Sequence, residues 1–389
     1  MSLAIAVWSI LLAIFVGVPT LYYLYMRRFS FKPWNVKRDS RYAPLVTVVV
    51  PMHNEEKIIK LKLENLMRID YPRDKLQIVI VNDGSDDASV PAVLEFQELN
   101  PLVKIEFLDN TGGAGKVESL NLALKHARGE VIIVSDADCF WPQDAIGKAL
   151  QFLSDSSVGA VAGLEVLLNP KETWVTESEI LYNDVVHTIR IGESKLHSTI
   201  IFQGGFGAYK RSLLDQFDVD ADDSGTALNI VQKGVRTLLV PEVMYFTVFP
   251  RTFKGKVSTK LRRANNLQRL WFRCLKLSSK GKVALPKRIF MPEAFLHLVN
   301  PFVFLFLIPA SVLVFAEYFI LLLLFLVFLV VAVLVGRLRT PIVEAVQDQL
   351  ILLGALFSSI VKRRFGLWTS EEASRACLTR EALENEGLV

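Results

Sequence analysis

Cysteine is scarce in this chain of 389 residues. Its three cysteines are too few for a disulfide scaffold and fit a reducing compartment. Glycine and proline, with 21 and 16 residues, are too few for a collagen-like or low-complexity protein. The low hydrophobicity of disordered proteins is also missing, since 51% of the residues are apolar. A mean hydropathy of +0.35 indicates that part of the chain lies in a membrane.

Acidic residues are absent from residues 251–290, which carry 13 basic residues and a net charge of +13. By contrast, residues 42–250 carry 18 basic and 30 acidic residues, net −12. Residues 1–41 have six basic residues and one acid, net +5, and residues 291–389 have seven and nine, net −2. The formal net charge of +4 therefore conceals a modular chain, in which an acidic domain lies between two basic stretches.

Charge is missing altogether from residues 3–25. A helix of this length extends roughly 35 Å at about 1.5 Å per residue, enough to cross a bilayer. A cleaved signal peptide is disfavoured by this length and by the lack of a preceding basic region. The six cations from Arg27 to Arg41 predict, by the positive-inside rule, that the N-terminus lies outside. We predict an integral cell-membrane protein with a transmembrane helix over residues 1–26 and a basic linker over 27–44.

A second apolar block runs from Ala294 to Gly336 and is interrupted only at Ala316-Glu317. Its length suits two membrane crossings with a tight turn between them. We predict a transmembrane hairpin over residues 291–337, with spans Ala294–Phe315 and Tyr318–Val335.

The last apolar run, Leu350–Val361, is shorter and ends in Lys362-Arg363-Arg364. A further span would place these three cations outside, against the positive-inside rule. We therefore favour an interfacial or re-entrant helix over residues 338–366, with a further span as the alternative. The remaining residues, 367–389, are expected to form a cytoplasmic tail.

Residues 45–250 alternate between short β-branched runs and amphipathic stretches. Because the runs are apolar throughout and separated by helices, they predict a mostly parallel α/β sheet covered on both faces. Open sheets of this kind bind ligands at the carboxyl ends of their strands. The expected strands are Thr47–Val50, Gln77–Val81, Lys104–Leu108 and Val131–Val134, and the expected helices are Glu55–Arg68, Asp87–Leu99, Val117–Arg128 and Asp144–Leu153.

Carboxylates follow three of these strands: Glu55 after the first, Asp83 after the second, and Asp136 with Asp138 after the fourth. A single such residue is typically a helix cap or turn residue, but three clusters at one sheet edge indicate a ligand site. Two carboxylates two residues apart on a turn can face one hard cation, Mg²⁺ or Mn²⁺. Such a cation would bridge a diphosphate and absorb the charge of a leaving phosphate.

A further acidic pair, Asp222-Asp223, precedes a helix expected over Ser224–Lys233. A carboxylate at a helix N-terminus is stabilised as the anion, so the pair can supply both a cap and a general base. Upstream, Gly204-Gly205 would let another group approach the backbone closely. Lys116 either neutralises a phosphate or is a solvated residue in a first helical turn, and the sequence leaves both open.

Five motifs in this order resemble the family-2 glycosyltransferases. The resemblance covers about residues 45–270, and the added membrane helices are similar to the cellulose-synthase-like branch of that family. It implies the GT-A fold, a nucleotide-sugar donor and glycosyl transfer with inversion at the anomeric carbon. The motifs are Pro51-x-x-Asn54-Glu55-Glu56, Asn82-Asp83-Gly84-Ser85, Gly115-Lys116 with Asn121, Asp136-Ala137-Asp138, and Asp222-Asp223 followed by Gly234.

The resemblance also implies a role for most of these residues. Asp138 would bind the metal, Mn²⁺ or Mg²⁺, and Asp223 would be the general base that deprotonates the acceptor hydroxyl. Asp222 stands where the family has Glu, and we place it on the acceptor side together with Gly204 and Gly205. The residues expected to bind the nucleotide sugar are Pro51, Asn54, Glu55, Asp83, Lys116 and Asp136.

The family's next motif, Gln-x-x-Arg-Trp, falls on Thr259-Lys260-Leu261-Arg262-Arg263. Only Arg262 matches, and the resemblance gives it a contact with the donor diphosphate. The Gln and Trp lie beside the acceptor in processive members, so their absence argues against polymer synthesis.

The basic stretch 251–290 also contains Leu267, Trp271, Phe272 and Leu275. This composition is typical of amphipathic helices on anionic lipid headgroups, where each cation contributes about 1 kcal/mol. Nucleic-acid binding is disfavoured, because the stretch runs directly into the transmembrane hairpin, and a solvated linker is the remaining alternative.

We therefore expect a membrane-bound, metal-dependent glycosyltransferase with a cytoplasmic catalytic domain. It would move a hexose from a UDP- or GDP-linked sugar, such as GDP-mannose or UDP-glucose, to a lipid-linked saccharide in glycan assembly. Single addition is favoured, because three spans are too few to enclose a channel for a polymer. The alternatives are a processive synthase of the cellulose, chitin or hyaluronan kind, and a non-catalytic nucleotide-sugar-binding scaffold.

Overall fold

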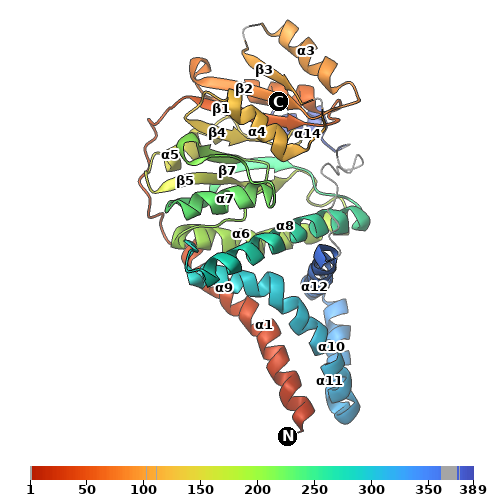
Figure 1. The fold of residues 1–389 in the computed structure, drawn as a ribbon. Helices are drawn as coiled ribbons and strands as arrows, with labels where there is room; N and C mark the ends of the chain where they lie inside the picture. The colour runs from red at the N-terminus through yellow and green to blue at the C-terminus, as the bar shows by residue number, and fades with distance from the viewer. Residues whose placement is uncertain (1, 102, 111, 361–374, 376) are drawn as a thin grey trace.

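A computed structural model describes residues 2–101, 103–110, 112–360, 375 and 377–389. Figure 1 shows an α/β head on a narrow helical stalk, with the N-terminus at the far tip of the stalk and the C-terminus on the head. The strands are β1 (Val46–Met52), β2 (Leu76–Asn82), β3 (Ile105–Asp109), β4 (Val131–Val134), β5 (Val158–Leu167), β6 (Gly207–Lys210) and β7 (Arg236–Thr247).

The helices of the head are α2 (Ile59–Met67), α3 (Ser89–Leu99), α4 (Lys116–His126), α5 (Ala145–Leu153), α6 (Trp174–Leu196), α7 (Asp222–Gln232) and the short α14 (Arg380–Asn385). The stalk and its junction with the head contain α1 (Leu3–Ser30), α8 (Phe253–Ser279), α9 (Lys287–Ala294), α10 (Asn300–Glu317), α11 (Phe319–Leu334) and α12 (Gly336–Ile360). A π-helical turn, Phe295–Val299, joins α9 to α10.

The strands form one seven-stranded sheet in the order β3-β2-β1-β4-β6-β5-β7. The four strands expected from the sequence are present and parallel, with Val48 of β1 between Ile78 of β2 and Ile133 of β4. β6 runs antiparallel to both neighbours, and β5 pairs in parallel with β7. The mostly parallel sheet is therefore confirmed, whereas β5, β6, β7 and helix α6 were not part of the sequence prediction.

Helices cover both faces of the sheet, as the apolar strands predicted. Every residue of β1 is buried, and successive residues of a strand face opposite sides. Val48 belongs to the apolar cluster that includes α2, α3 and α5, and Val49 belongs to the cluster that includes α4, α7 and α8. Because β1, β2 and β4 are parallel, the acidic loops that follow them leave from one edge of the sheet.

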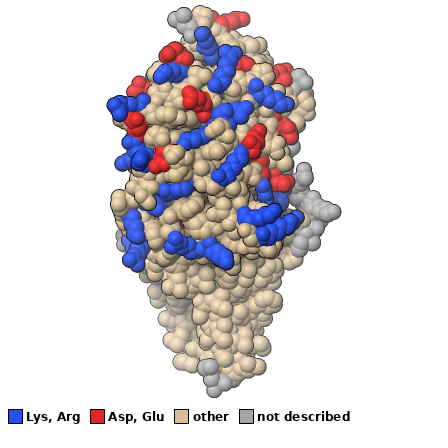
Figure 2. Space-filling view, turned by 60° about the vertical axis from the view of Figure 1, so that its left-hand side comes forward, with Lys and Arg blue, Asp and Glu red and all other residues tan. Residues whose placement is uncertain are grey.

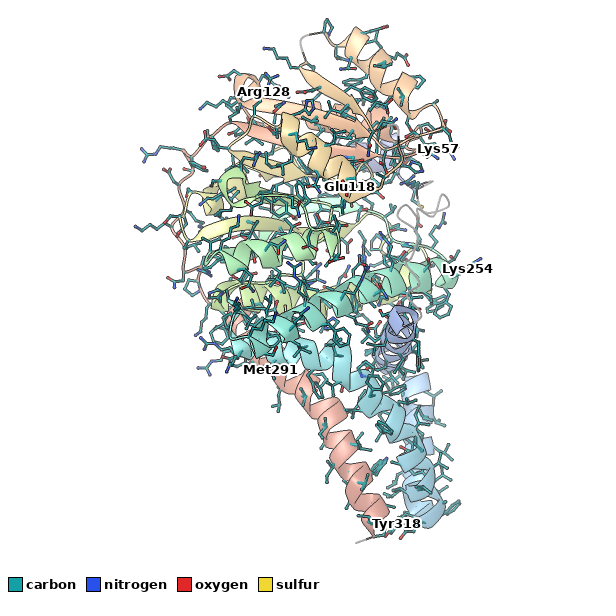
Figure 3. The ribbon with its side chains drawn as sticks, in the orientation of Figure 1. Lys57, Glu118, Arg128, Lys254, Met291 and Tyr318 are labelled. Carbon is teal, nitrogen blue, oxygen red and sulfur yellow. The ribbon has the colours of Figure 1, made fainter. Side chains whose placement is uncertain are left out.

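α1 and α10 run antiparallel along the stalk. Trp8 donates from Nε1 to Ser311 Oγ at 2.9 Å, and Ser2 Oγ donates to the Glu317 carboxylate at 2.9 Å. Figure 2 shows that the visible face of the stalk is free of charged side chains, whereas the head above it carries many. Tyr318, between α10 and α11, lies at the tip of the stalk (Figure 3), where the sequence predicted the hairpin turn.

Within the described residues, three helices are long and apolar enough to cross a membrane: Leu3–Ser30, Lys287–Glu317 and Thr340–Ser359. The second limb of the hairpin contains a shorter apolar helix, Phe319–Ala332. α12 is seen almost end-on in Figure 1 and so crosses the direction of α10 and α11. The interfacial placement of this helix stays a prediction, and the Lys362-Arg363-Arg364 cluster lies outside the described residues.

The basic segment consists largely of α8, which lies between the head and α12. We expected its cations to face lipid headgroups, but the structure buries several of them in ion pairs. Lys256 is fully buried and pairs with Glu344 of α12, and Lys260 pairs with Glu179 of α6 at 3.2 Å and Asp348 of α12 at 3.1 Å. Burying a charge costs much less when the charge is paired in this way. Contact of the remaining, exposed cations with headgroups stays a prediction.

The crossing of α1 over α6 depends on Gly192, where a Cβ atom would lie 2.2 Å from the carbonyl oxygen of Met26. Gly192→Val should therefore separate the two helices and lower the free energy of unfolding by about 1–3 kcal/mol, the usual cost of overpacking. Thermal unfolding of the detergent-solubilised chain measures this. The control is Gly147→Ala in α5, where an added Cβ meets nothing within 4 Å. Equal stability of the two variants would contradict the close crossing.

Candidate active site

The loop after β1 is shaped by contacts with two other loops. Asn54 adopts a left-handed conformation with φ of 56°, and its side chain exchanges two hydrogen bonds with Asp86, at 2.7 and 3.0 Å. Glu55 is only 3% exposed, and its carboxylate pairs with Arg375 from the C-terminal segment. Burial, reinforced by the charge of Asp138, raises the pKa of Glu55 to about 9. Arg375 opposes this rise, so the tail stabilises the charged form of a motif residue at the start of the domain.

Asp83 is fully buried and holds the loop that leads into α4. Its carboxylate accepts hydrogen bonds from the N–H of Gly115 at 2.9 Å, from the Ser119 hydroxyl at 3.0 Å and from the Asn110 side chain at 3.0 Å. Gly115 has φ of 101°, a value that favours glycine. The next residue is Lys116, so this loop sets the position from which the lysine extends.

Asp136, Asp138 and Cys139 bring three ligand atoms within 4.8 Å of one another after β4. Burial, together with the charge of Asp136, raises the pKa of Asp138, and burial raises the pKa of the Cys139 thiol well above its usual range. A buried thiol is a poor donor for a hard cation, which prefers oxygen ligands, while the two crowded carboxylates favour a cation between them. Oxygen donors suit Mg²⁺ and Mn²⁺, so the residues present fit the predicted metal.

The turn that carries these carboxylates rests on Lys62 of α2. The fully buried lysine donates from Nζ to Ser135 Oγ at 2.7 Å and to the carbonyl oxygen of Cys139 at 2.5 Å. Burial lowers the pKa of Lys62 to about 7. The sequence analysis missed this residue, because a lysine in an amphipathic helix gives no sign that it points into the protein.

Lys116 lies between the two acidic pairs. Its Nζ is 2.8 Å from a carboxylate oxygen of Asp136, 3.3 Å from Asp223 and 3.8 Å from Asp222. Burial lowers the pKa of Lys116, but the three carboxylates outweigh this effect and raise it well above its usual range. Gly204 makes room for the contact, because a Cβ there would lie 2.4 Å from both Lys116 Nζ and Asp136. The solvated alternative for Lys116 is therefore wrong.

Asp223 lies in the first turn of α7, as the sequence predicted for a carboxylate at a helix N-terminus. Burial and the neighbouring charge of Asp222 raise the pKa of Asp223 to about 7, against the opposing effect of Lys116. A carboxyl group that titrates near neutral pH is well matched to proton abstraction from a hydroxyl group.

A cavity of about 380 Å³ extends from these carboxylates to the membrane helices. At its far end it is lined by Pro19 of α1, Leu296 of the π-helical turn and Asn300 of α10. Gly205 is not among its lining residues and instead packs against the Tyr245 ring. The predicted site residues that line the cavity are Lys116, Asp136, Gly204, Asp222, Asp223 and Arg262, whereas Pro51, Asn54, Glu55, Asp83 and Asp138 lie outside it.

Two arginines of this cavity stand out. Arg262 of α8 lines the cavity, as the motif alignment predicted. Burial lowers the pKa of its guanidinium group. Within the described part of the chain, its Nε atom has no hydrogen-bond partner. Arg190 of α6 also lines it and was missed, because the sequence analysis identified neither α6 nor its place beside the site. Arg375 was missed as well, since nothing in the sequence links a tail residue to Glu55.

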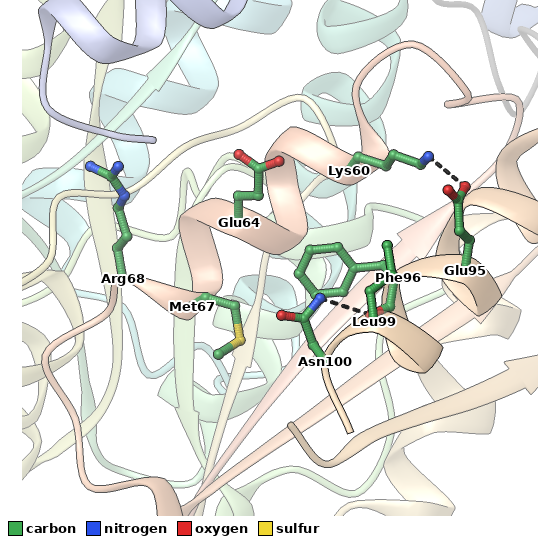
Figure 4. Close-up of a pocket in the computed structure, with 8 residues that line it drawn as sticks. All are labelled: Lys60, Glu64, Met67, Arg68, Glu95, Phe96, Leu99 and Asn100. Carbon is green, nitrogen blue, oxygen red and sulfur yellow. Dashed lines mark hydrogen bonds and ion pairs between the residues drawn. The ribbon is translucent and has the colours of Figure 1, made fainter. Parts of the chain in front are cut away.

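A second hollow, of about 440 Å³, lies between α2 and α3 and is shown in Figure 4. Lys60 and Glu95 pair across it at 2.6 Å, and Asn100 donates to the carbonyl oxygen of Phe96 at 2.9 Å. None of its lining residues belongs to the acidic motifs. Glu64 pairs with Arg380, which lies outside the hollow, and we assign the hollow no role.

Residues 47–217 match the family described as "Glycosyl transferase family 2". A solved structure, "Mannosyltransferase PcManGT from Pyrobaculum calidifontis in complex with GDP-Man and Mn2+", is 33% identical to this chain with a TM-score of 0.79. The match covers 93% of this chain and 100% of that one. The chain therefore belongs to glycosyl transferase family 2 and has the GT-A fold, which confirms the resemblance seen in its motifs.

Two curated relatives are more distant. The "N-acetylglucosaminyltransferase" of Rhizobium meliloti (strain 1021) is 27% identical over 255 residues, which cover 61% of this chain and 59% of that protein. The "Poly-beta-1,6-N-acetyl-D-glucosamine synthase" of Staphylococcus aureus (strain COL) is 24% identical over 265 residues, with coverage of 66% and 63%. The chain thus spans about three fifths of the length of the curated relatives that it matches.

The metal site can be tested by substituting its oxygen and sulfur donors one at a time. Asp138→Asn should weaken Mn²⁺-dependent binding of GDP or UDP at least about tenfold, or about 1.4 kcal/mol, because the amide carries no charge. Cys139→Ala should leave it unchanged, since Mn²⁺ at this site is expected to take oxygen rather than sulfur donors. Titration calorimetry with and without Mn²⁺ measures both, with the exposed Asp144→Asn as the matched control. A loss in Cys139→Ala alone would contradict the assignment.

Proposed function

We propose that this protein is a membrane-bound inverting glycosyltransferase that transfers a hexose from a nucleotide-diphosphate sugar to a lipid-linked saccharide. The observation that carries the proposal is the cavity between head and stalk. One end of it contains Asp136 and Asp223, and the other is lined by Pro19 and Leu296 next to the stalk helices. An acceptor whose lipid chain lies in the bilayer can reach the carboxylates through this space.

In the reaction, Asp223 takes the proton of the acceptor hydroxyl, which then attacks the anomeric carbon opposite the leaving diphosphate. A single displacement of this kind inverts the configuration. Lys116 and Arg262 stabilise the charge that develops on the departing nucleotide diphosphate, as preorganised cations in a water-poor site. A divalent cation on Asp138 and Asp136 would supply Lewis-acid stabilisation of that diphosphate when bound. Glu55, Asn54, Asp83 and Pro51 belong to the loops proposed to hold the base and ribose.

Lys116 has a second role in the proposed reaction. In the ligand-free chain its ammonium group neutralises Asp136 and Asp223 together. When the donor enters with its diphosphate, the phosphates compete for the ammonium, and Asp223 loses part of its counter-charge. The free carboxylate then becomes the stronger base, so donor binding prepares the group that activates the acceptor.

GDP-mannose is the first donor to test, because the relative with 33% identity was solved with GDP-Man and Mn²⁺. UDP-glucose remains open, and UDP-N-acetylglucosamine joins it because the curated relatives are named for N-acetylglucosamine transfer. One of them is a polysaccharide synthase, which keeps polymer synthesis as the second candidate. Against it stand the small number of candidate spans and the motif in which only Arg262 is retained.

The proposed topology follows the arrangement of the stalk. Ser2 and Glu317 are hydrogen-bonded at its tip, at the end remote from the catalytic head (Figure 1). If α1 crosses the membrane, the N-terminus and the hairpin turn lie on one side and the head on the other, and the cations from Arg27 to Arg41 favour a cytoplasmic head by the positive-inside rule. Glu317 at the tip would then face water rather than lipid.

The proposed base makes a prediction about pH. Because the pKa of Asp223 is raised to about 7, kcat/KM should rise with pH up to about 7, where the carboxylate loses its proton, and then level off. Asp223→Asn should lower transfer of labelled mannose into organic-extractable product at least about 10²-fold, as expected for loss of a general base. Binding of GDP-mannose should stay within threefold, roughly, since the donor does not need this proton acceptor.

The control for Asp223→Asn is Asp215→Asn, which removes a carboxylate that is 80% exposed and paired with Lys233. It should leave rate and pH profile unchanged. Turnover retained by Asp223→Asn would remove this residue as the base. Loss of donor binding in the Asp223→Asn variant would indicate that Asp223 has a structural role instead.

Product length separates single addition from polymerisation. With saturating donor and membranes containing the protein, mass spectrometry of the extracted lipid should show one added hexose per acceptor. A ladder of products, or water-soluble polymer, would favour the processive synthase. Neutral glycolipid and lipid-phosphate fractions should be assayed separately, so that the product also identifies the acceptor class.

A further inference from the structure

Arg190 of α6 is a buried cation that faces the cavity without a partner. Its exposed fraction is 5%, it lines the cavity, and its Nε has no hydrogen-bond partner. Among the ion pairs between described residues, none includes its guanidinium. Because an unpaired buried charge is costly, this arrangement suits an anionic group that enters from the cavity.

The other cations of the cavity wall are occupied or already have a proposed partner. Lys116 lies among Asp136, Asp222 and Asp223, and Lys260 pairs with Glu179, Glu344 and Asp348. Arg263 is 3.6 Å from Glu165. Arg262 is proposed to contact the donor diphosphate. Arg190 and Arg262 are therefore the cavity-lining cations without a carboxylate partner in the described part of the chain, and of the two only Arg262 already has a proposed ligand.

Two carboxylates near Arg190 have partners of their own. Glu193 accepts a hydrogen bond from the Tyr22 hydroxyl at 2.5 Å. Glu293 is 3.4 Å from Nδ1 of His297. Neither comes within the 4.0 Å of an ion pair with Arg190. They influence its electrostatic environment, but they leave the hydrogen-bonding face of the guanidinium unoccupied.

The surroundings of Arg190 match an amphiphile rather than a free ion. Val186 and Ile189, on the same helix, line the cavity beside it, and Pro19 and Leu296 continue the apolar wall toward the stalk. Residues three and four apart on a helix lie on one face, so Val186 and Arg190 are neighbours on the wall. An anion held by Arg190 would thus have an apolar chain on its membrane side.

We propose that Arg190 binds a phosphate group of the lipid acceptor, so that the acceptor is a lipid joined to its sugar through phosphate or diphosphate. Guanidinium groups bind phosphate oxygens through paired N–H donors. The inference rests on the proposed function and adds the chemistry of the link between lipid and sugar. By fixing the phosphate, Arg190 would act as a positioning residue that sets which sugar hydroxyl reaches Asp223.

The test uses phytanyl phosphate, a branched C20 phosphate ester, with phytanol as the uncharged equivalent. Both are titrated into the full chain in a neutral detergent, and binding is followed by thermophoresis. Phytanyl phosphate should bind at least tenfold more tightly than phytanol. Inorganic phosphate and dioleoyl phosphatidylglycerol serve as competitors, to distinguish a free ion and a bulk headgroup from the proposed ligand, and neither should compete at equal concentration.

Three variants locate the effect. Arg190→Gln should abolish the tenfold preference for the phosphate ester, and Arg190→Lys should retain part of it, because one charge remains without the paired donors. Arg288→Gln removes an exposed arginine at the start of α9, which does not line the cavity, and should behave like wild type. In a transfer assay, Arg190→Gln should raise KM for a phosphate-linked acceptor more than it lowers kcat.

The outcomes distinguish this inference from the function on which it rests. If nucleotide sugars bind and transfer occurs, but phytanol binds as well as phytanyl phosphate, the inference is wrong and the proposed function stands. Equal behaviour of Arg190→Gln and Arg288→Gln, or equal competition by phosphatidylglycerol, would also overturn it. Failure of every nucleotide sugar to bind would reject the proposed function itself. The comparison on the wild-type chain needs no variant, so misfolding of Arg190→Gln cannot hide the result.

Discussion

Negative charge gathered at one edge of a single sheet is the constraint on which the rest of this structure depends. Parallel strands end on the same side, so the loops after β1, β2 and β4 bring Glu55, Asp83, Asp136 and Asp138 together, and α7 adds Asp222 and Asp223. Like charges at this separation repel strongly in a partly buried site. This repulsion is offset by Lys116, which lies between two acidic groups, and by Arg375, which pairs with Glu55. Backbone and side-chain hydrogen-bond donors stabilise the Asp83 carboxylate. What remains is the room and the charge for a cation and a diphosphate.

Buried ion pairs between α8 and α12 join the head to the stalk. Lys256 and Lys260 of α8 are buried against Glu344 and Asp348 of α12. Because breaking such a pair leaves an uncompensated buried charge, the two helices are held in one register. The cavity lies beside this junction and takes its walls from both parts, with Asp223 on the head and Pro19 on the stalk. This arrangement supports the proposal that the donor enters from water and the acceptor from lipid.

The presence or absence of carboxylate partners for the cavity-lining cations connects the two proposals. Among the cavity-lining cations of the described chain, Lys260 and Arg263 pair with carboxylates and hold the structure, whereas Lys116 pairs with carboxylates and is also proposed to contact the donor. Among the described residues, Arg262 and Arg190 have no carboxylate within ion-pair distance and are assigned to the donor and the acceptor. If both assignments hold, two phosphate groups are bound on opposite sides of the sugar transfer, and the distance between the two arginines sets the length of the reacting complex.

Prediction from sequence succeeded where the signal is local. Apolar β-branched runs indicated β1 to β4, and each was found within two residues of its expected bounds. Boundaries were less certain where a residue had a tertiary partner: a helix expected from Glu55 begins at Ile59, because Glu55 is held in the loop by Ser89 and Arg375. The second half of the sheet was missed: β6 has only four residues, runs antiparallel to its neighbours, and is separated from β5 by the 23-residue helix α6. Asp136, Lys116, Asp222 and Asp223 were identified as site residues, but not the contact between them.

By itself, the sequence determined the class of the protein, because the order of acidic motifs after apolar strands and the charge-free stretches are properties of the chain alone. It also determined that residues 251–290 had to find counter-charges somewhere. Only the tertiary structure decided where these counter-charges lie, since Lys256 and Lys260 are buried against α12. Arg190 belongs to a helix that was not predicted from the sequence, and it faces the cavity. Which cations are paired depends on contacts between residues tens to hundreds of positions apart, and composition and spacing carry no record of such contacts.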